Sequence, residues 1–198
     1  IQNSCNVFFA EMAHRLSTDE NGNYSPERGI EMIRKYASMF GLDETTGIEI
    51  AENSPQMTTE NPESSAIGQG TNAYSNVQLA RYISAVANKG TVFKLSLLDK
   101  MTDSQGNLIE DFTPAVRSQI DIQDSTWTAV HTGMRRVISD GSASKIFNDL
   151  EVPIAGKTGT AEEVKNGHTI NHAFFVSFAP CDDPEIAVTV NIPYGYSS

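Results

Sequence analysis

The chain has 198 residues, of which 39% are hydrophobic and 20% are charged, so it is long enough to bury a core and too apolar for wholesale disorder. Its formal net charge of −11 disfavours a nucleic-acid partner, because phosphate binding requires clustered lysine and arginine. No run of about eighteen apolar residues occurs, so the sequence predicts no membrane-spanning segment.

The first predicted helix spans residues 7–16. Its apolar content predicts that it is largely buried, and Asn6 stands directly before it, where an N-cap residue is favoured. The polar segment 19–24 contains a glycine and therefore predicts a loop after this helix.

The second predicted helix runs from Ser25 to about Phe40. Ser25 suits the N-cap and Pro26 the first helical position, while Gly41 is typical of a helix C-terminus. After Gly41 the helical periodicity ends, and a short strand is expected at 47–50.

A long polar segment follows at residues 52–65. It is rich in Asn, Pro, Ser and Thr, and a structureless stretch of this length inside a domain is usually functional or disordered. Residues 66–70 close the segment with two glycines. Apolar residues at helical spacing then predict a helix over 76–88, which ends at Gly90.

The middle of the chain predicts a hairpin and a further helix. Residues 91–98 and 108–112 flank a turn-rich loop at 103–107, which favours two antiparallel strands joined by that loop. Apolar residues at helical spacing predict the next helix over 125–138, and two arginines lie in its last turns, where cations are favoured.

The last part of the chain predicts an antiparallel meander. Residues 153–163 combine an apolar entry with β-branched residues, which suits a strand. An Asn-Gly pair at 166–167 predicts a turn, and an apolar strand follows at 173–179. A second turn at 181–184 then leads to a returning strand at 185–192.

Cysteine and histidine spacing predicts neither a disulfide framework nor a metal site. Cys5 and Cys181 are far apart and form no C-x-x-C pattern, so we expect two unpaired thiols. His168 and His172 lie four residues apart in a predicted strand, but no acidic or thiol partner is near them in the sequence.

Four residues of the 153–163 strand form the main candidate site. Lys157 offers one positive charge, Thr158 and Thr160 offer two hydroxyl donors, and Gly159 lets another molecule approach the backbone closely. Together they suit an anionic, amide-bearing ligand bound along a strand. The alternative is an ordinary strand entering a turn, because Lys-Thr-Gly alone is a weak motif.

Two other short patterns are candidates for chemistry. Ser4 and Asn6 place a hydroxyl and a carboxamide at the start of the first helix, where a simple helix cap is the alternative. Ser142 and Lys145 form a Ser-x-x-Lys pattern, in which an amine one turn away could act as the base for a nucleophilic serine. Their polar neighbours favour an exposed helix start instead.

Taken together and in order, these motifs resemble the class B penicillin-binding proteins, the membrane-anchored D,D-transpeptidases of bacterial cell-wall synthesis. Ser-x-Asn and Lys-Thr-Gly are the second and third motifs of the penicillin-binding and serine β-lactamase group. The resemblance covers nearly the whole chain. Its other elements are Val-Phe-Phe at 7–9, Gly-Ile at 47–48, Ile-Gly-Gln-Gly at 67–70, Gln-Leu-Ala at 78–80, Ala-Asn-Lys-Gly at 87–90 and Gly-Met-x-x-Val at 133–137.

The resemblance implies an α+β fold in which helices pack on an antiparallel sheet. Residues 1–198 are then the C-terminal part of one transpeptidase domain, with a mainly helical part over about 1–90 and the hairpin, helix and sheet over about 91–198. The family's Ser-x-x-Lys nucleophile motif precedes Ser-x-Asn, so we expect it upstream of Ile1 in a longer protein, and Ser142 comes too late to replace it. A sheet without its upstream part is expected to expose an edge or an apolar face.

The resemblance also implies a role for each motif residue. Ser4 belongs to a proton relay, and Asn6 hydrogen-bonds the amide of the bound peptide. Lys157 supplies positive potential, Thr158 and Thr160 donate to the substrate carboxylate beside Gly159, and the Thr160 N–H is half of the oxyanion hole. No metal or organic cofactor is implied. The expected partners are peptidoglycan stem peptides, β-lactam antibiotics and other cell-wall synthesis proteins.

We therefore expect a serine-type D,D-transpeptidase at the extracytoplasmic face of the bacterial cell membrane, with its anchor upstream of this chain. The chain alone is expected to be catalytically inert. Two alternatives remain, a β-lactam-binding sensor or other non-catalytic relative, and a serine β-lactamase. Rapid turnover of the acyl-enzyme in the complete protein would favour the β-lactamase.

Overall fold

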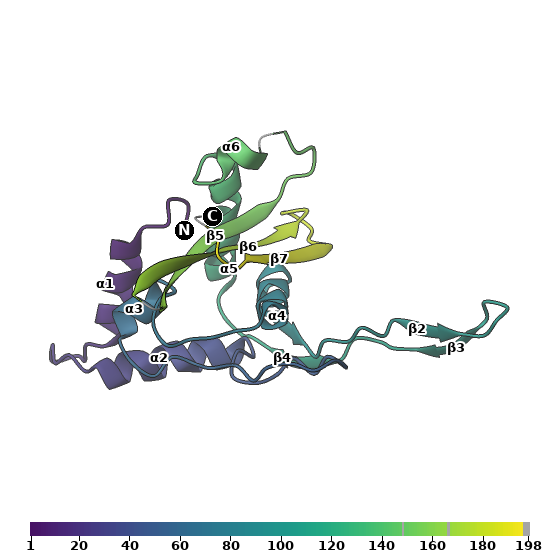
Figure 1. The fold of residues 1–198 in the computed structure, drawn as a ribbon, viewed down its shortest axis with the longest axis horizontal. Coiled ribbons are helices and arrows are strands. Elements are labelled where there is room, and N and C mark those ends of the chain that lie inside the picture. Colours follow the sequence, from purple (N-terminus) through teal and green to yellow (C-terminus); the bar gives the residue numbers. More distant parts are fainter. Residues whose placement is uncertain (148, 166, 196–198) are drawn as a thin grey trace.

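A three-stranded antiparallel sheet lies at the centre of the computed structural model, which describes residues 1–147, 149–165 and 167–195 (Figure 1). Its strands are β5 (Ala155–Lys165), β6 (His168–Ala179) and β7 (Ile186–Ile192), in the order β5-β6-β7. The predicted meander is confirmed. Asn166 of the predicted turn lies outside the described residues, whereas Gly167 has a φ of 77°, which suits a tight turn.

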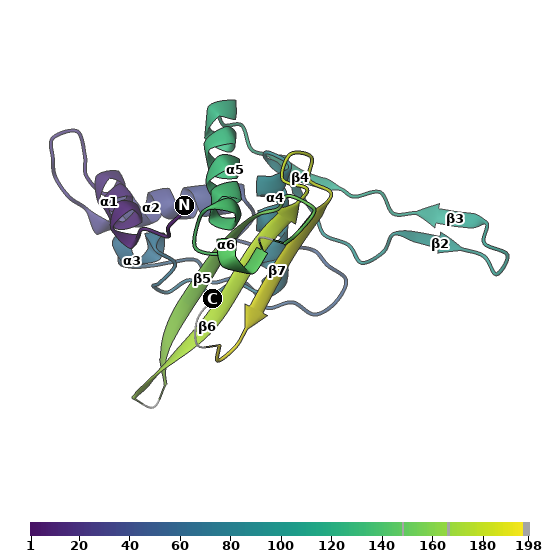
Figure 2. The ribbon, with the colours of Figure 1, turned by 90° about the horizontal axis from the view of Figure 1, so that it is seen from above.

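Two helices pack against this sheet. Helix α4 (Asn76–Ala87) lies against β6 and β7, and α5 (Asp124–Ser139) lies against β5 (Figure 2). Both helices were predicted, and α4 begins with a capping box formed by Ser75 and Gln78. The main core cluster joins these helices to the sheet through Ile83, Val86, Ala87, Met134, Ala155 and Phe178.

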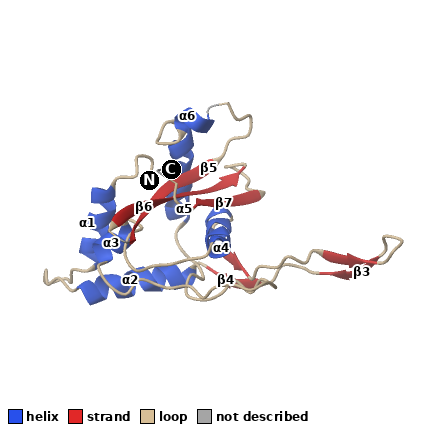
Figure 3. Cartoon of the chain, in the orientation of Figure 1, coloured by secondary structure: helices blue, strands red, loops and turns tan. Residues whose placement is uncertain are grey.

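Helices α1 (Asn6–Leu16), α2 (Pro26–Met39) and α3 (Pro62–Ala66) form a group beside the sheet (Figure 3). The prediction for α2 is confirmed, since the Ser25 hydroxyl caps it by accepting a hydrogen bond from the Arg28 N–H at 3.3 Å. The helix ends before Gly41, as expected.

Two predictions for α1 are wrong. The helix begins at Asn6 itself, so Cys5 occupies the N-cap position, and its side chain makes no capping hydrogen bond. The helix is also not largely buried, because Val7 and Phe8 are 78% and 57% exposed. Only the side around Ala13 packs against α2 and α3, which leaves the other apolar side of α1 without a covering element among the described residues.

The segment between α2 and α4 differs from the prediction in two places. Residues 47–50 form no strand, because Gly47 has a φ of 87° and the Glu49 carboxylate accepts hydrogen bonds from Ser96 Oγ and the Leu97 N–H. The polar stretch 52–65 is not structureless, since it ends in α3. The Asn61 side chain caps this helix by accepting from the Ser64 N–H at 3.0 Å.

A two-stranded arm projects from the body of the molecule (Figure 1). Strand β2 (Lys100–Thr102) pairs with β3 (Leu108–Asp111), and β1 (Thr91–Phe93) pairs with β4 (Val116–Gln119) at the base of the arm. The predicted hairpin was therefore wrong for its first strand. The strand at 91–93 instead pairs with residues beyond the hairpin, a pairing that no local turn signal indicates.

Strand β7 carries an exposed apolar stripe. Ile186, Val188, Val190 and Ile192 alternate along one face of the strand and are between 42% and 61% exposed. The expectation that this sheet exposes an apolar face agrees with that stripe. Within the described part of the chain, no helix has the length and apolar character needed to cross a membrane.

Candidate functional site

The four residues of the Lys-Thr-Gly-Thr motif lie in β5, at one edge of the sheet. Side chains alternate between the two faces of a strand, so Lys157 and Gly159 share one face while Thr158 and Thr160 share the other. A Cβ atom at Gly159 would meet only Phe174, at an ordinary contact distance of 3.5 Å. The sheet itself therefore does not require glycine here, which fits a position kept small for a ligand.

The backbone of β5 presents polar groups to the open edge of the sheet. The Thr158 carbonyl accepts a hydrogen bond from Lys157 Nζ at 2.5 Å, and the Thr160 carbonyl accepts one from Gln69 Nε2 at 3.2 Å. Both donors are side-chain groups and not the backbone of a neighbouring strand. Since the N–H and C=O of one strand residue point to the same side, Thr158 and Thr160 direct both groups away from β6. An extended ligand could pair with this edge.

The structure brings Ser4 and Lys157 together across 153 positions of the sequence. Lys157 Nζ donates a hydrogen bond to Ser4 Oγ at 2.5 Å. Ser4 lies in a turn with a φ of 48°, and its N–H donates to the Ile1 carbonyl at 3.1 Å. Asn6 follows as the exposed first residue of α1, and no described residue hydrogen-bonds its side chain.

Lys157 has no negatively charged partner among the described residues. Within the described part of the chain, its amine donates to the Ser4 hydroxyl and the Thr158 carbonyl, which are both neutral. Burial lowers the pKa of the Lys157 amine below its ordinary value of 10.5. A half-buried amine with neutral partners attracts an anion from solution, because its charge is not compensated within the chain.

The lowered pKa of Lys157 predicts a pH dependence of stability. The unfolded chain binds more protons than the folded chain between the lowered folded pKa and 10.5, so the amine's contribution to stability rises with pH in that window. The free energy of unfolding of the wild-type chain should therefore rise relative to that of Lys157→Met as pH approaches 10.5. Urea denaturation of both proteins at several pH values tests this, and a difference that stays constant or falls would contradict it.

A cavity of about 700 Å³ lies beside the motif strand. Gly159, Thr160 and Ala161 form one wall, and apolar side chains of α2 and α4 form much of the rest. The apolar lining includes Ile33, Tyr36, Phe40, Leu79, Tyr82 and Phe174. The space next to Thr160 therefore suits an apolar segment of protein better than open solvent.

The Ser-x-x-Lys pattern at Ser142 and Lys145 does not form a catalytic pair. Helix α6 (Ser144–Phe147) begins after Ser142, and the described residues show no hydrogen bond between Ser142 and Lys145. The expected exposed helix is present, but it begins at Ser144, so Ser142 stands one position before the cap and does not cap the helix. Its exposed side chain instead lies beside the motif strand, with Oγ 3.4 Å from Thr158 Oγ1.

The contacts of Ser142 and Gln69 with β5 could not be predicted from the sequence. Gln69 lies in the Ile-Gly-Gln-Gly sequence, but 91 positions separate it from the carbonyl that it reaches. Ser142 stands 16 positions before Thr158, with the whole of α6 between them. Neither contact leaves a spacing signal, because both depend on how separate elements pack.

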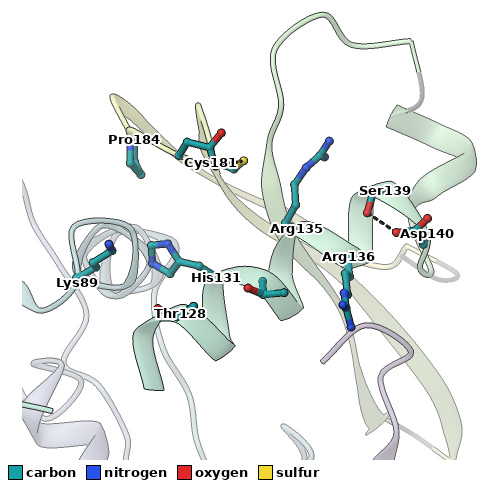
Figure 4. Close-up of a pocket in the computed structure, with 11 residues that line it drawn as sticks. Lys89, Thr128, His131, Arg135, Arg136, Ser139, Asp140, Cys181 and Pro184 are labelled. Carbon is teal, nitrogen blue, oxygen red and sulfur yellow. Dashed lines mark hydrogen bonds between the residues drawn. The ribbon is translucent and has the colours of Figure 1, made fainter. Parts of the chain in front are cut away.

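A second cavity, of about 450 Å³, lies between α5 and the turn that joins β6 to β7 (Figure 4). Lys89, His131, Arg135 and Arg136 line it, together with the thiol of Cys181. Arg135 and Arg136 point in opposite directions in Figure 4, so their charges do not converge on one ligand. No residue of the two motifs lines this cavity, and the site that they predict lies at β5.

Comparison with known proteins matches the chain to one family. The model of the penicillin-binding protein transpeptidase domain matches residues 1–197. Penicillin-binding protein 2A of Bacillus subtilis is 30% identical over 99% of this chain and 30% of its own length. The peptidoglycan D,D-transpeptidase MrdA of Acinetobacter baumannii is 26% identical over 94% of this chain and 30% of its own length.

A solved structure shows the same fold. Penicillin-binding protein 2B of Streptococcus pneumoniae superposes with a TM-score of 0.84 and 27% identity, over 98% of this chain and 35% of that one. The expected mixture of helices and antiparallel sheet is thus confirmed. The chain spans about 30% of the length of the two curated relatives above.

Proposed function

The chain belongs to the penicillin-binding protein transpeptidase family, and we propose that the protein containing it cross-links bacterial peptidoglycan by D,D-transpeptidation through a serine acyl-enzyme. The observation that carries this proposal is the contact between Lys157 and Ser4 at the open edge of β5. It joins a cation, a hydroxyl and an exposed strand backbone, which are the groups that an anionic peptide ligand requires.

The nucleophilic serine of this mechanism comes from outside residues 1–198. The cavity beside Thr160 has the apolar lining that a buried helix carrying a Ser-x-x-Lys sequence would need. A serine there would lie next to the Thr160 backbone, whose N–H points to the open edge and supplies one half of the oxyanion hole. The nucleophile's own N–H supplies the other half.

Acylation then proceeds along the edge of β5. The serine hydroxyl gives its proton to the lysine of the Ser-x-x-Lys sequence, its oxygen attacks the carbonyl carbon of the penultimate D-alanine, and the bond to the terminal D-alanine nitrogen breaks. That nitrogen takes the same proton from the lysine through Ser4, which the Lys157 amine orients. Lys157, Thr158 and Thr160 hold the terminal carboxylate, and Asn6 binds the amide of the stem peptide. A neighbouring peptide's amine finally attacks the ester, loses its proton to the same relay and releases the serine.

The remaining parts of the function follow from this scheme. The complete protein acts at the extracytoplasmic face of the cell membrane, held by an anchor outside this chain. Stem peptides are its substrates, β-lactams acylate the same serine, and other cell-wall synthesis proteins are its partners. Residues 1–198 alone are inert, because they do not contain the nucleophile.

Release of D-alanine tests the proposal. The complete protein, incubated with a stem pentapeptide and an acceptor amine, should release one D-alanine for each cross-link, and prior treatment with penicillin should abolish the release. Penicillin binding without D-alanine release would identify a sensor instead. Continuous hydrolysis of a chromogenic cephalosporin would identify a β-lactamase, and either outcome contradicts the transpeptidase.

A further inference from the structure

The turn between α5 and α6 holds a hydroxyl beside Thr158 that the mechanism above does not use. Ser142 Oγ lies 3.4 Å from Thr158 Oγ1. We propose that Ser142 is a positioning residue, which orients the Thr158 hydroxyl toward the carboxylate of the bound peptide or β-lactam. This inference rests on the proposed function, since it requires that Thr158 donate to that carboxylate.

The turn that carries Ser142 packs beside the segment that leads into Ser4 and beside strand β5. Ala143 is fully buried, and its N–H donates to the Val137 carbonyl at 3.0 Å. A Cβ atom at Gly141 would approach the Gln2 carbonyl oxygen to 2.6 Å, so this turn lies directly on the segment that leads into Ser4. These contacts place the turn that carries Ser142 between the Ser-x-Asn segment and the motif strand.

The Ser142 side chain has no part in forming this turn. Ser144 supplies the local hydrogen bonds, with its Oγ and its N–H both donating to the Gly141 carbonyl, at 2.9 and 3.2 Å. Ser142 is exposed, so it contributes little to packing. Among the described residues, its hydroxyl has one side-chain partner, Thr158.

A hydrogen bond from the Ser142 hydroxyl can orient the proton of the Thr158 hydroxyl. A threonine hydroxyl has one proton to donate and two lone pairs that accept. When Ser142 donates to Thr158 Oγ1, the Thr158 proton is directed away from Ser142 and toward the ligand. The chain of donors from Ser142 through Thr158 to a carboxylate is polarised along its length, which strengthens the last hydrogen bond. Without Ser142, the Thr158 hydroxyl can rotate away.

The test compares ligands with and without the carboxylate. In the complete protein, Ser142→Ala should lower the second-order rate of acylation by benzylpenicillin roughly three- to tenfold, the usual value of one such hydrogen bond. With benzylpenicillin methyl ester, which has no free carboxylate, the acylation rate of Ser142→Ala should stay within about twofold of the wild-type rate. Ser142→Thr keeps the hydroxyl and should restore the rate with benzylpenicillin.

Two further variants separate positioning from turn structure. Ser144→Ala removes a hydroxyl of the same turn that does not reach Thr158, so it should lower the melting temperature without changing the preference for the carboxylate. In a Thr158→Val background, Ser142→Ala should have no further effect, because Thr158 transmits its action. This double-mutant cycle can be measured with benzylpenicillin as the only ligand.

The outcomes distinguish this inference from the proposed function. If benzylpenicillin does not acylate the wild-type protein, the proposed function fails, and the inference with it. If the wild-type protein reacts, three results overturn only the role of Ser142. Ser142→Ala is acylated as fast as wild type, or its acylation rate falls equally with benzylpenicillin and with the methyl ester. The third result is that Ser142→Ala lowers the acylation rate of Thr158→Val by its full single-mutant factor.

Discussion

Lys157→Ala in the complete protein is expected to lower the rate of penicillin acylation by about 10²- to 10³-fold, the cost of losing one charge-stabilising donor in other acyl-transfer enzymes. Lys157 is half-buried and has no anionic partner among the described residues, so its charge is available to the ligand carboxylate. Its amine also orients the Ser4 hydroxyl, and the substitution removes both effects.

Lys145→Ala is the matched control for this change. Lys145 carries the same charge on the exposed surface of α6 and belongs to the Ser-x-x-Lys pattern that has no catalytic geometry. Its loss should change the acylation rate by no more than about twofold, because exposed charges are screened by solvent. Stopped-flow or gel-based labelling measures both rates. Equal losses in the two variants would contradict the role given to Lys157.

Arg81→Met is expected to destabilise the chain by about 3–5 kcal/mol, because the chain loses three hydrogen bonds from a charged donor, each worth about 1.5 kcal/mol. Arg81 is 1% exposed, and its guanidinium donates to the main-chain carbonyls of Gly41, Glu44 and Thr45. Methionine has a similar length but no donors, so the three carbonyls lose the one side chain that links them. Urea denaturation measures the change in the free energy of unfolding.

The same substitution should also loosen the base of the arm. Glu44 pairs with Arg117 of β4, so the segment that Arg81 fixes also holds the β1–β4 ribbon. Amide hydrogen exchange in β1 and β4 should therefore accelerate in Arg81→Met. Arg15→Met is the control, because Arg15 forms an exposed pair with Glu11 on α1 and should cost no more than about 0.5 kcal/mol. If both variants lose the same stability, Arg81 is not the anchor described above.

The elements that could be predicted from sequence are those with local signals. Helix α2 begins at a Ser-Pro pair and ends before a glycine. The strands of the central sheet are separated by residues that are typical of turns. The pairing of β1 with β4 depends on residues beyond an intervening hairpin. The exposure of α1 depends on what packs against it, and an apolar composition alone does not determine that.

The same distinction between local signals and long-range contacts applies to the candidate site. Motif order identified Ser4 and Lys157 as members of one site, and the structure places their side chains in hydrogen-bonding contact. Motif order could not indicate that Gln69 binds the Thr160 carbonyl or that Ser142 faces Thr158. Both contacts arise from loops whose positions depend on the packing of α3, α5 and α6. Long-range contacts of this kind leave no periodicity in the sequence.

Mapping of the covalently bound penicillin tests the central claim most directly. The complete protein and the isolated 198-residue chain are each incubated with penicillin, digested, and analysed by peptide mass spectrometry. The expected result is one adduct in the complete protein, on the serine of a Ser-x-x-Lys sequence outside residues 1–198, and none on the isolated chain. An adduct on any residue of this chain, including Ser142 or Ser4, or no adduct on the complete protein, would contradict the account.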